Sequence, residues 1–145
     1  QVDAVLDSLA VAANSTGANA MMSGEVGLPI TRAFAAFGRG EYATTIEELQ
    51  RVRPYANRFG GSHAQRDIVH LTLVEAALRS DDAALAQALA AERTDLKPSS
   101  PFNWQLTARA YATAGQRVEA QHALDLAAAA VTKQQSRPDA TRVAA

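Results

Sequence analysis

The sequence predicts an all-α protein of about seven helices, and two observations lead to that prediction. Apolar residues make up 48% of the 145-residue chain while aromatic residues make up only 6%, and Ala and Leu dominate the apolar set. Small side chains in that proportion favour close packing of helices over the core of a β-sandwich. Apolar residues also recur at helical spacing, and no segment shows the sustained alternation of a half-buried strand.

Spacing and helix-breaking residues predict the bounds of these helices. Residues 14–24 are rich in Ser, Thr, Gly and Asn and are expected to form a loop. Pro29 and Pro101 suit the first turn of a helix, where a missing N–H costs nothing, and Gly115 is expected to end a helix. We therefore expect helices at residues 2–13, 29–38, 41–56, 62–79, 82–97, 101–114 and 117–133.

Four of these helix starts carry a short polar residue that is typical of an N-cap. The expected caps are Thr44 (with Glu47), Ser62 (with Gln65), Asp81 or Asp82, and Ser100. Residues 1–133 are expected to form a single domain. The polar tail, residues 134–145, is expected to be disordered.

Residues 104–127 carry the spacing of a two-helix repeat. Trp104, Ala108 and Tyr111 stand at i, i+4 and i+7, Gly115 follows, and Ala120, Leu124 and Ala127 continue the pattern. This pattern resembles the tetratricopeptide repeat, a helix–turn–helix unit of about 34 residues. The small Ala108 and Ala120 would let the two backbones approach, while Trp104, Tyr111 and Leu124 would fill the space around the crossing.

The resemblance implies a right-handed α-solenoid of antiparallel helix pairs, with turns expected at residues 40–41, 81–82 and 115–116. Only the last two turns are separated by the repeat length of about 34 residues. Such a solenoid binds a partner peptide or domain on a concave groove, formed mainly by the first helix of each pair. In this register the groove residues are Phe34, Phe37, Leu71, Glu75, Phe102, Gln105 and Arg109. For the three phenylalanines, ordinary core packing is the alternative.

Four short strings resemble a narrower family. They are VGLP at residues 26–29, GGSHAQRD at 60–67, AALRS at 76–80 and PSSPF at 98–102. Together they resemble the family of tetratricopeptide repeat protein 38 and its bacterial relatives. The resemblance implies an α-helical repeat fold and implies that this chain is the C-terminal portion of a longer protein. It implies no catalytic residues.

One polar cluster interrupts an otherwise apolar helix face. His63, Asp67 and His70 stand at i, i+4 and i+7, within about 60° of one another around the helix. With Arg66 they form a candidate polar site, since two imidazoles and a carboxylate suit a divalent metal or acid–base chemistry. The alternative is structural: Asp67 lies near the positive end of the helix dipole and pairs with a His or with Arg66. We expect no bound metal or cofactor.

Charge and composition exclude several classes of partner. Fourteen basic and fifteen acidic residues give a net charge of −1, without a basic run, so nucleic acid and an anionic membrane are not expected partners. The lack of cysteine excludes disulfides and thiolate catalysis. The longest apolar run, residues 126–131, is too short to span a bilayer. The cytoplasm is the default localisation.

These observations predict a protein-interaction scaffold and not an enzyme. Two alternatives stay open. The segment at residues 60–67 would form a small-molecule or metal site, catalytic in the full-length protein, or the chain would be an architectural module that forms a homodimer.

Overall fold

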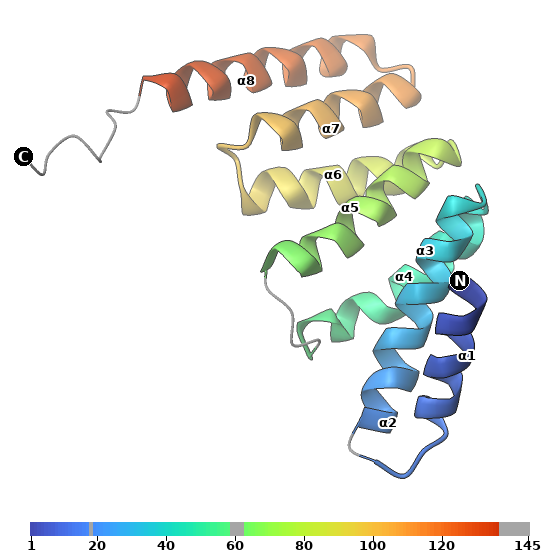
Figure 1. Ribbon diagram of the computed structural model, residues 1–145. Coiled ribbons are helices and arrows are strands. Elements are labelled where there is room, and N and C mark those ends of the chain that lie inside the picture. Colours follow the sequence, from blue (N-terminus) through green and yellow to red (C-terminus); the bar gives the residue numbers. More distant parts are fainter. Residues whose placement is uncertain (18, 59–62, 137–145) are drawn as a thin grey trace, which may run out of the picture. The chain divides into compact units, whose positions relative to one another are not determined.

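The structure is a computed structural model of the 145-residue chain, and all regular structure in the residues that it describes is helical (Figure 1). It describes the backbone of residues 1–17, 19–58 and 63–136, and their side chains except those of 56–58 and 63–66. The longer helices are α1 (Val2–Ala13), α3 (Leu28–Gly38), α4 (Tyr42–Val52), α5 (His63–Arg79), α6 (Ala83–Leu96), α7 (Pro101–Thr113) and α8 (Arg117–Gln135). For this part of the chain the all-α prediction is confirmed.

The loop expected at residues 14–24 is wrong from residue 19 onward. There the chain forms a short helix, α2 (Asn19–Met22), and a π-helix, η1 (Ser23–Gly27). The glycines and serines of this segment suggest a loop, but here the glycines lie in helices, where their lack of a side chain allows close packing. A Cβ on Gly24 would lie 3.3 Å from the Cβ of Ala13, so η1 packs closely on α1.

The helix expected to reach residue 56 ends earlier. α4 ends at Val52, and a 3₁₀-helix, η2 (Arg53–Arg58), follows it. Pro54 has no N–H to continue the α-helical ladder, and its ring crowds the preceding turn. The position of this proline therefore predicts the change better than the apolar periodicity does.

Contacts divide the chain into two compact units, Gln1–Asp81 and Asp82–Ala145, and each is described by itself. In the first unit α3 packs on α4, α4 packs on α5, and α1 lies against α3 and η1. The buried Thr45 hydroxyl lies between α4 and α3, where it can donate to the carbonyl oxygen of Glu41 in α4 at 3.0 Å and to that of Ala33 in α3 at 3.3 Å. The expectation of a single domain over residues 1–133 stays a prediction.

In the second unit α7 packs on both α6 and α8 (Figure 1). Its apolar core is mostly alanine, which lets the helix backbones approach closely; the buried set is Ala86, Leu89, Ala90, Leu106, Ala108, Ala110, Ala123 and Ala127. Burial of Ala108 agrees with the expected crossing of α7 and α8. Leu124 is 46% exposed, so the expectation that it fills that crossing is wrong.

Two of the expected turns have the same backbone geometry. Gly40 and Gly115 have φ angles of 78° and 74°, a left-handed conformation that glycine adopts without steric cost. In both turns the next residue donates its N–H back across the helix end, from Glu41 to Ala36 O and from Gln116 to Tyr111 O, each at 2.9 Å. Asp81 has the same left-handed conformation, with a φ of 56°.

The predictions of N-caps differ in outcome. Asp82 accepts from the N–H of Leu85 at 3.1 Å and Ser100 from that of Asn103 at 3.3 Å, so both of these caps are confirmed. Thr44 lies inside α4, whose N-cap is Glu41 without a side-chain hydrogen bond, so the capping box expected there is wrong. Ser62 and the tail residues 137–145 lie outside the described residues, whereas residues 134–135 are helical.

Candidate functional site

The candidate site is a groove in the second unit that runs over α7. Its wider part encloses about 410 Å³ and is lined by three helices. Its floor is formed by Trp104, Thr107 and Tyr111 of α7. Its walls are Gln87, Ala91 and Thr94 of α6, and Val118, Glu119, His122, Ala123 and Leu126 of α8.

A second hollow of about 360 Å³ continues the groove along α8. It shares Trp104 and Leu126 with the first hollow, and it extends over Ala129 and Ala130 to Lys133. We call the two hollows together the α7 groove. From Glu119 to Lys133 it follows four turns of α8, a length of about 21 Å at the helical rise.

The groove exists because large and small side chains are distributed unevenly around α7. The two large rings, Trp104 and Tyr111, stand seven residues apart on α7, while Ala91, Ala123 and Ala129 on the walls provide no bulk to cover them. Both rings are therefore only partly buried. An incompletely covered pair of aromatic rings is a common centre of binding energy at interfaces.

Hydrogen bonds hold Trp104 and the part of the groove toward Lys133 in place. The indole Nε1 of Trp104 donates to the carbonyl oxygen of Pro98 at 2.8 Å. Gln134, near the end of α8, donates from Nε2 to the carbonyl oxygen of Ser99 at 2.9 Å. The segment between α6 and α7 is thereby joined to both helices that line this part of the groove, so the indole has a defined orientation.

A buried polar pair joins α6 to α7. Arg93 is 8% exposed and Asn103 is 3% exposed. The Nε of Arg93 donates to Asn103 Oδ1 at 3.1 Å. In return, Asn103 Nδ2 donates to the carbonyl oxygens of Arg93 at 2.8 Å and of Lys97 at 3.4 Å. These carbonyls belong to the last turn of α6 and its C-cap, and they also accept the backbone N–H groups of Lys97 at 3.0 Å and Ser100 at 3.1 Å.

Among the described residues that line the groove, the ionisable groups lie near its two ends. Glu119 and His122 lie at the end near the start of α8, and Lys133 lies at the opposite end. All three residues are exposed. The groove thus presents an apolar centre with an acidic group at one end and a basic group at the other.

The groove residues expected from the sequence in this unit lie on another side of α7. Phe102, Gln105 and Arg109 are exposed and line neither hollow, and Phe102 is 50% exposed. Core packing is therefore excluded for Phe102. The concave face that these three residues were expected to form stays a prediction.

In the first unit, the structure brings two expected groove residues together around Arg79. Its guanidinium carbon lies 5.2 Å from the ring centroid of Phe37 and 5.8 Å from that of Tyr42. The two rings meet edge to face at 5.6 Å. Arg79 Nε also donates to Glu75 Oε1 at 2.9 Å. Hydrogen bonds with Tyr42 and then with Glu75 raise the pKa of Arg79.

This arrangement shows why two expected groove residues have structural partners. The cation of Arg79 lies over Phe37, and Glu75 is half-buried and paired with Arg79. Phe34 and Leu71 are also half-buried. The sequence signal that was missed is the placement of Phe37 and Tyr42 on either side of the turn at residues 38–41.

The polar candidate on α5 is only partly within the described residues. The side chains of His63 and Arg66 lie outside them. Asp67 and His70 are half-buried, and neither is without an interaction partner. In the part of the chain that the structure describes, no group of three or more acidic or histidine side chains gathers as a metal site. Whether His63 completes such a site stays a prediction.

Comparison with known proteins does not place the chain in a family. No protein-family model matches it. No solved structure matches it either. The resemblance to tetratricopeptide repeats therefore stays a prediction from the spacing of residues. Over the described ranges, none of the helices combines the length and apolar character needed to cross a membrane.

Proposed function

We propose that this protein is an interaction module that binds an amphipathic helical segment of a partner protein in the α7 groove. The observation that carries the proposal is that two hollows lie along the same side of α8 and share Trp104 and Leu126 as lining residues. A trough between parallel rows of side chains accepts a helix whose apolar residues recur at i, i+3, i+4 and i+7. At about 21 Å, the groove matches roughly 14 residues of such a helix.

The chemistry of the lining supports a protein segment as the ligand. Trp and Tyr supply large contact areas with a polar edge and few rotatable bonds, so little entropy is lost on binding. The apolar centre would bury the partner's aliphatic side chains. Glu119 and Lys133 at the ends would favour a segment with a basic residue near one end and an acidic residue near the other.

The expected solenoid belongs to the same proposal. Left-handed residues at Gly40, Asp81 and Gly115 each separate one helix from the next, as expected for successive helix pairs. A right-handed stack of such pairs would leave one groove per pair for binding. Small-angle X-ray scattering of the chain tests this arrangement, because a maximum dimension near that of a sphere of equal mass would argue against a solenoid.

The binding proposal can be tested with a synthetic peptide of 14 residues with Leu at helical spacing, Lys at one end and Glu at the other. Trp104 is the only tryptophan in the chain, so its fluorescence reports on the groove without labelling. We expect a saturable change in this fluorescence on titration. A peptide of the same composition with the leucines scrambled is expected to give none.

Two neighbouring alanines on α8 provide a matched pair of variants. Ala129 lines the groove, Ala128 does not, and both are exposed. Ala129→Glu is expected to weaken peptide binding by at least tenfold, because it places a charge on the apolar wall. Ala128→Glu should leave binding unchanged. Equal binding by both variants would contradict the assignment of the groove.

A triple change of Phe102, Gln105 and Arg109 to alanine tests the concave face expected from the sequence. Loss of binding in this variant, with full binding by Ala129→Glu, would assign the interaction to that face instead. Light scattering on the unmodified chain tests the homodimer alternative. A dimer that Ala129→Glu converts to monomer would identify a second copy of the chain as the groove's occupant.

A further inference from the structure

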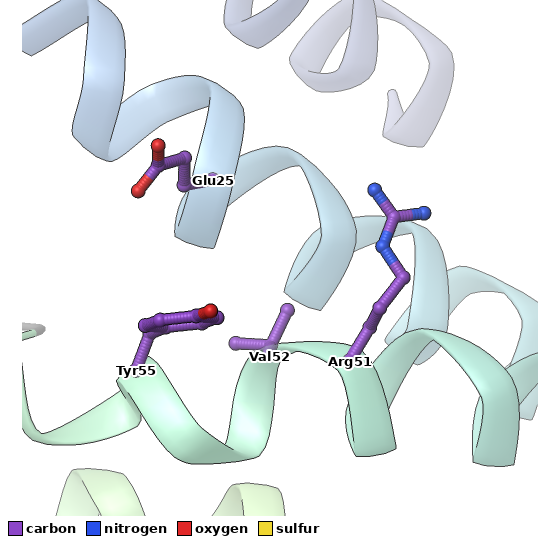
Figure 2. Close-up of a pocket in the computed structure, with 4 residues that line it drawn as sticks. All are labelled: Glu25, Arg51, Val52 and Tyr55. Carbon is purple, nitrogen blue, oxygen red and sulfur yellow. The ribbon is translucent and has the colours of Figure 1, made fainter.

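The first unit contains a separate pocket of about 530 Å³ between η1 and the C-terminal end of α4 (Figure 2). Glu25 of η1 forms one wall. Arg51 and Val52 of α4 and Tyr55 of η2 form the other. The volume falls within the usual range of small-molecule sites, about 300–1,000 Å³.

Local structure explains why Glu25 faces this pocket. The next residue, Val26, is 2% exposed and fixes η1 to the core of the unit. Glu25 stays exposed beside it. The widened turn of a π-helix changes the direction in which its side chains project, and π-helical turns often occur at functional sites.

The opposite wall combines an anchored apolar residue with two exposed ones. Val52 is 1% exposed and Tyr55 is 44% exposed. Figure 2 shows Glu25 across the pocket from Tyr55, with Val52 between Tyr55 and Arg51. The pocket therefore has an aromatic ring and a carboxylate at one end, a guanidinium at the other, and an apolar surface between them.

The two charges do not neutralise each other. Within the described residues, Glu25 and Arg51 form no ion pair with each other or with another side chain. In this respect they differ from Arg39 and Glu41 or Arg79 and Glu75, which are paired in the same unit. Two opposite charges at opposite ends of one pocket are complementary to a ligand that carries both charges.

We propose that this pocket binds a small zwitterion that has a carboxylate and an ammonium group joined by a short apolar spacer. The planar guanidinium of Arg51 suits bidentate hydrogen bonds to the ligand carboxylate. The carboxylate of Glu25 and the face of the Tyr55 ring suit the ammonium group. The spacer lies over Val52. This small-molecule site is separate from the α7 groove and does not depend on it.

The same geometry disfavours other ligand classes. A phosphate or dicarboxylate would pair with Arg51 but would bring negative charge toward Glu25. A diamine would pair with Glu25 but would bring positive charge toward Arg51. Among the described residues that line the pocket there is one carboxylate, which is too few ligands for a metal ion that requires four or more.

The test uses ω-amino acids of two, four and six carbons as probes. Binding is measured by NMR titration of the ¹⁵N-labelled chain, alongside the matching monocarboxylates and monoamines. We expect at least one ω-amino acid to bind about fivefold more tightly than either of its single-charge analogues, since each exposed ion pair adds a modest factor. Failure of all three to exceed their analogues would overturn the proposal.

Four glutamine variants locate the site. In Arg51→Gln we expect the zwitterion to bind no more tightly than the monoamine, because the partner of its carboxylate is lost. In Glu25→Gln we expect the zwitterion to bind no more tightly than the monocarboxylate, because the partner of its ammonium group is lost. The controls are Arg32→Gln and Glu47→Gln, which change exposed charges of the same unit outside the pocket. These should leave affinity unchanged. If the controls weaken binding as much as the pocket variants do, the effect reflects net charge and the proposed site is wrong.

Discussion

Replacement of Asn103 by alanine tests the structural basis of the candidate site most directly. Asn103 is 3% exposed and makes three hydrogen bonds that join the start of α7 to Arg93 and to the C-terminal end of α6. The α7 groove is lined by both helices, so its shape depends on this joint. The variant removes an amide without removing any large apolar contact.

The expected cost follows from the hydrogen bonds that are lost. The hydrogen bond from Asn103 Nδ2 to Arg93 O contributes about 1 kcal/mol to the free energy of unfolding. The longer hydrogen bond to Lys97 O contributes less than this. The bond from the Arg93 guanidinium adds about 1.5–3 kcal/mol because its donor is charged. Together these predict a loss of about 3 kcal/mol in the free energy of unfolding. For a chain of this size the midpoint of thermal unfolding should fall by about 10 °C.

Circular dichroism at 222 nm during heating measures this change. The matched control is Gln105→Ala, which also converts an amide to alanine in α7, at an exposed position. Its effect should stay within about 0.5 kcal/mol. Equal midpoints for the two variants would refute the reasoning, because the buried amide would then contribute no more than a solvated one.

Three further predictions concern the turns and contacts of the described residues. Gly115→Ala should lower the free energy of unfolding by about 1 kcal/mol because φ is positive at this residue. Gly38→Ala should raise it by about 0.5 kcal/mol, and a Cβ would meet open space at both sites. If urea denaturation shows that both variants change the free energy of unfolding in the same direction, the reasoning is wrong. Thr45→Val should cost about 1 kcal/mol by loss of a buried hydroxyl that donates to the carbonyl oxygens of Glu41 and Ala33, and an unchanged urea midpoint would argue against both bonds. A hydrogen bond from Arg39 holds the pKa of Glu41 below its ordinary value. The ionised carboxylate therefore stabilises the fold at pH values above the pKa of Glu41 in the unfolded chain. This stabilisation is lost as the pH falls through the lower pKa of Glu41 in the folded chain. NMR titration should show the Glu41 pKa rising in Arg39→Gln, and an unchanged value would exclude that cause.

The sequence by itself determined the features that depend on one helical turn. Helical periodicity located the longer helices, and the caps at Asp82 and Ser100 follow from a polar side chain placed three residues before a free N–H. The break at Gly115 is local in the same way. Where a local signal was misread, as at residues 19–24, the error came from treating glycine and serine as loop residues although close packing on α1 favours a helix.

Only the tertiary structure decided which side chains are covered. Trp104 and Tyr111 fit a repeat core in the sequence, yet they line a groove because the facing residues of α6 and α8 are alanines. The burial of Arg93 likewise depends on Asn103 of another helix. The pocket at Glu25 brings the π-helix η1 to a wall that lies 26 to 30 residues further along the chain. Periodicity assigns a residue to a face of its own helix. Its exposure also depends on the size of the side chains on neighbouring helices. Those neighbouring side chains come from distant positions in the sequence.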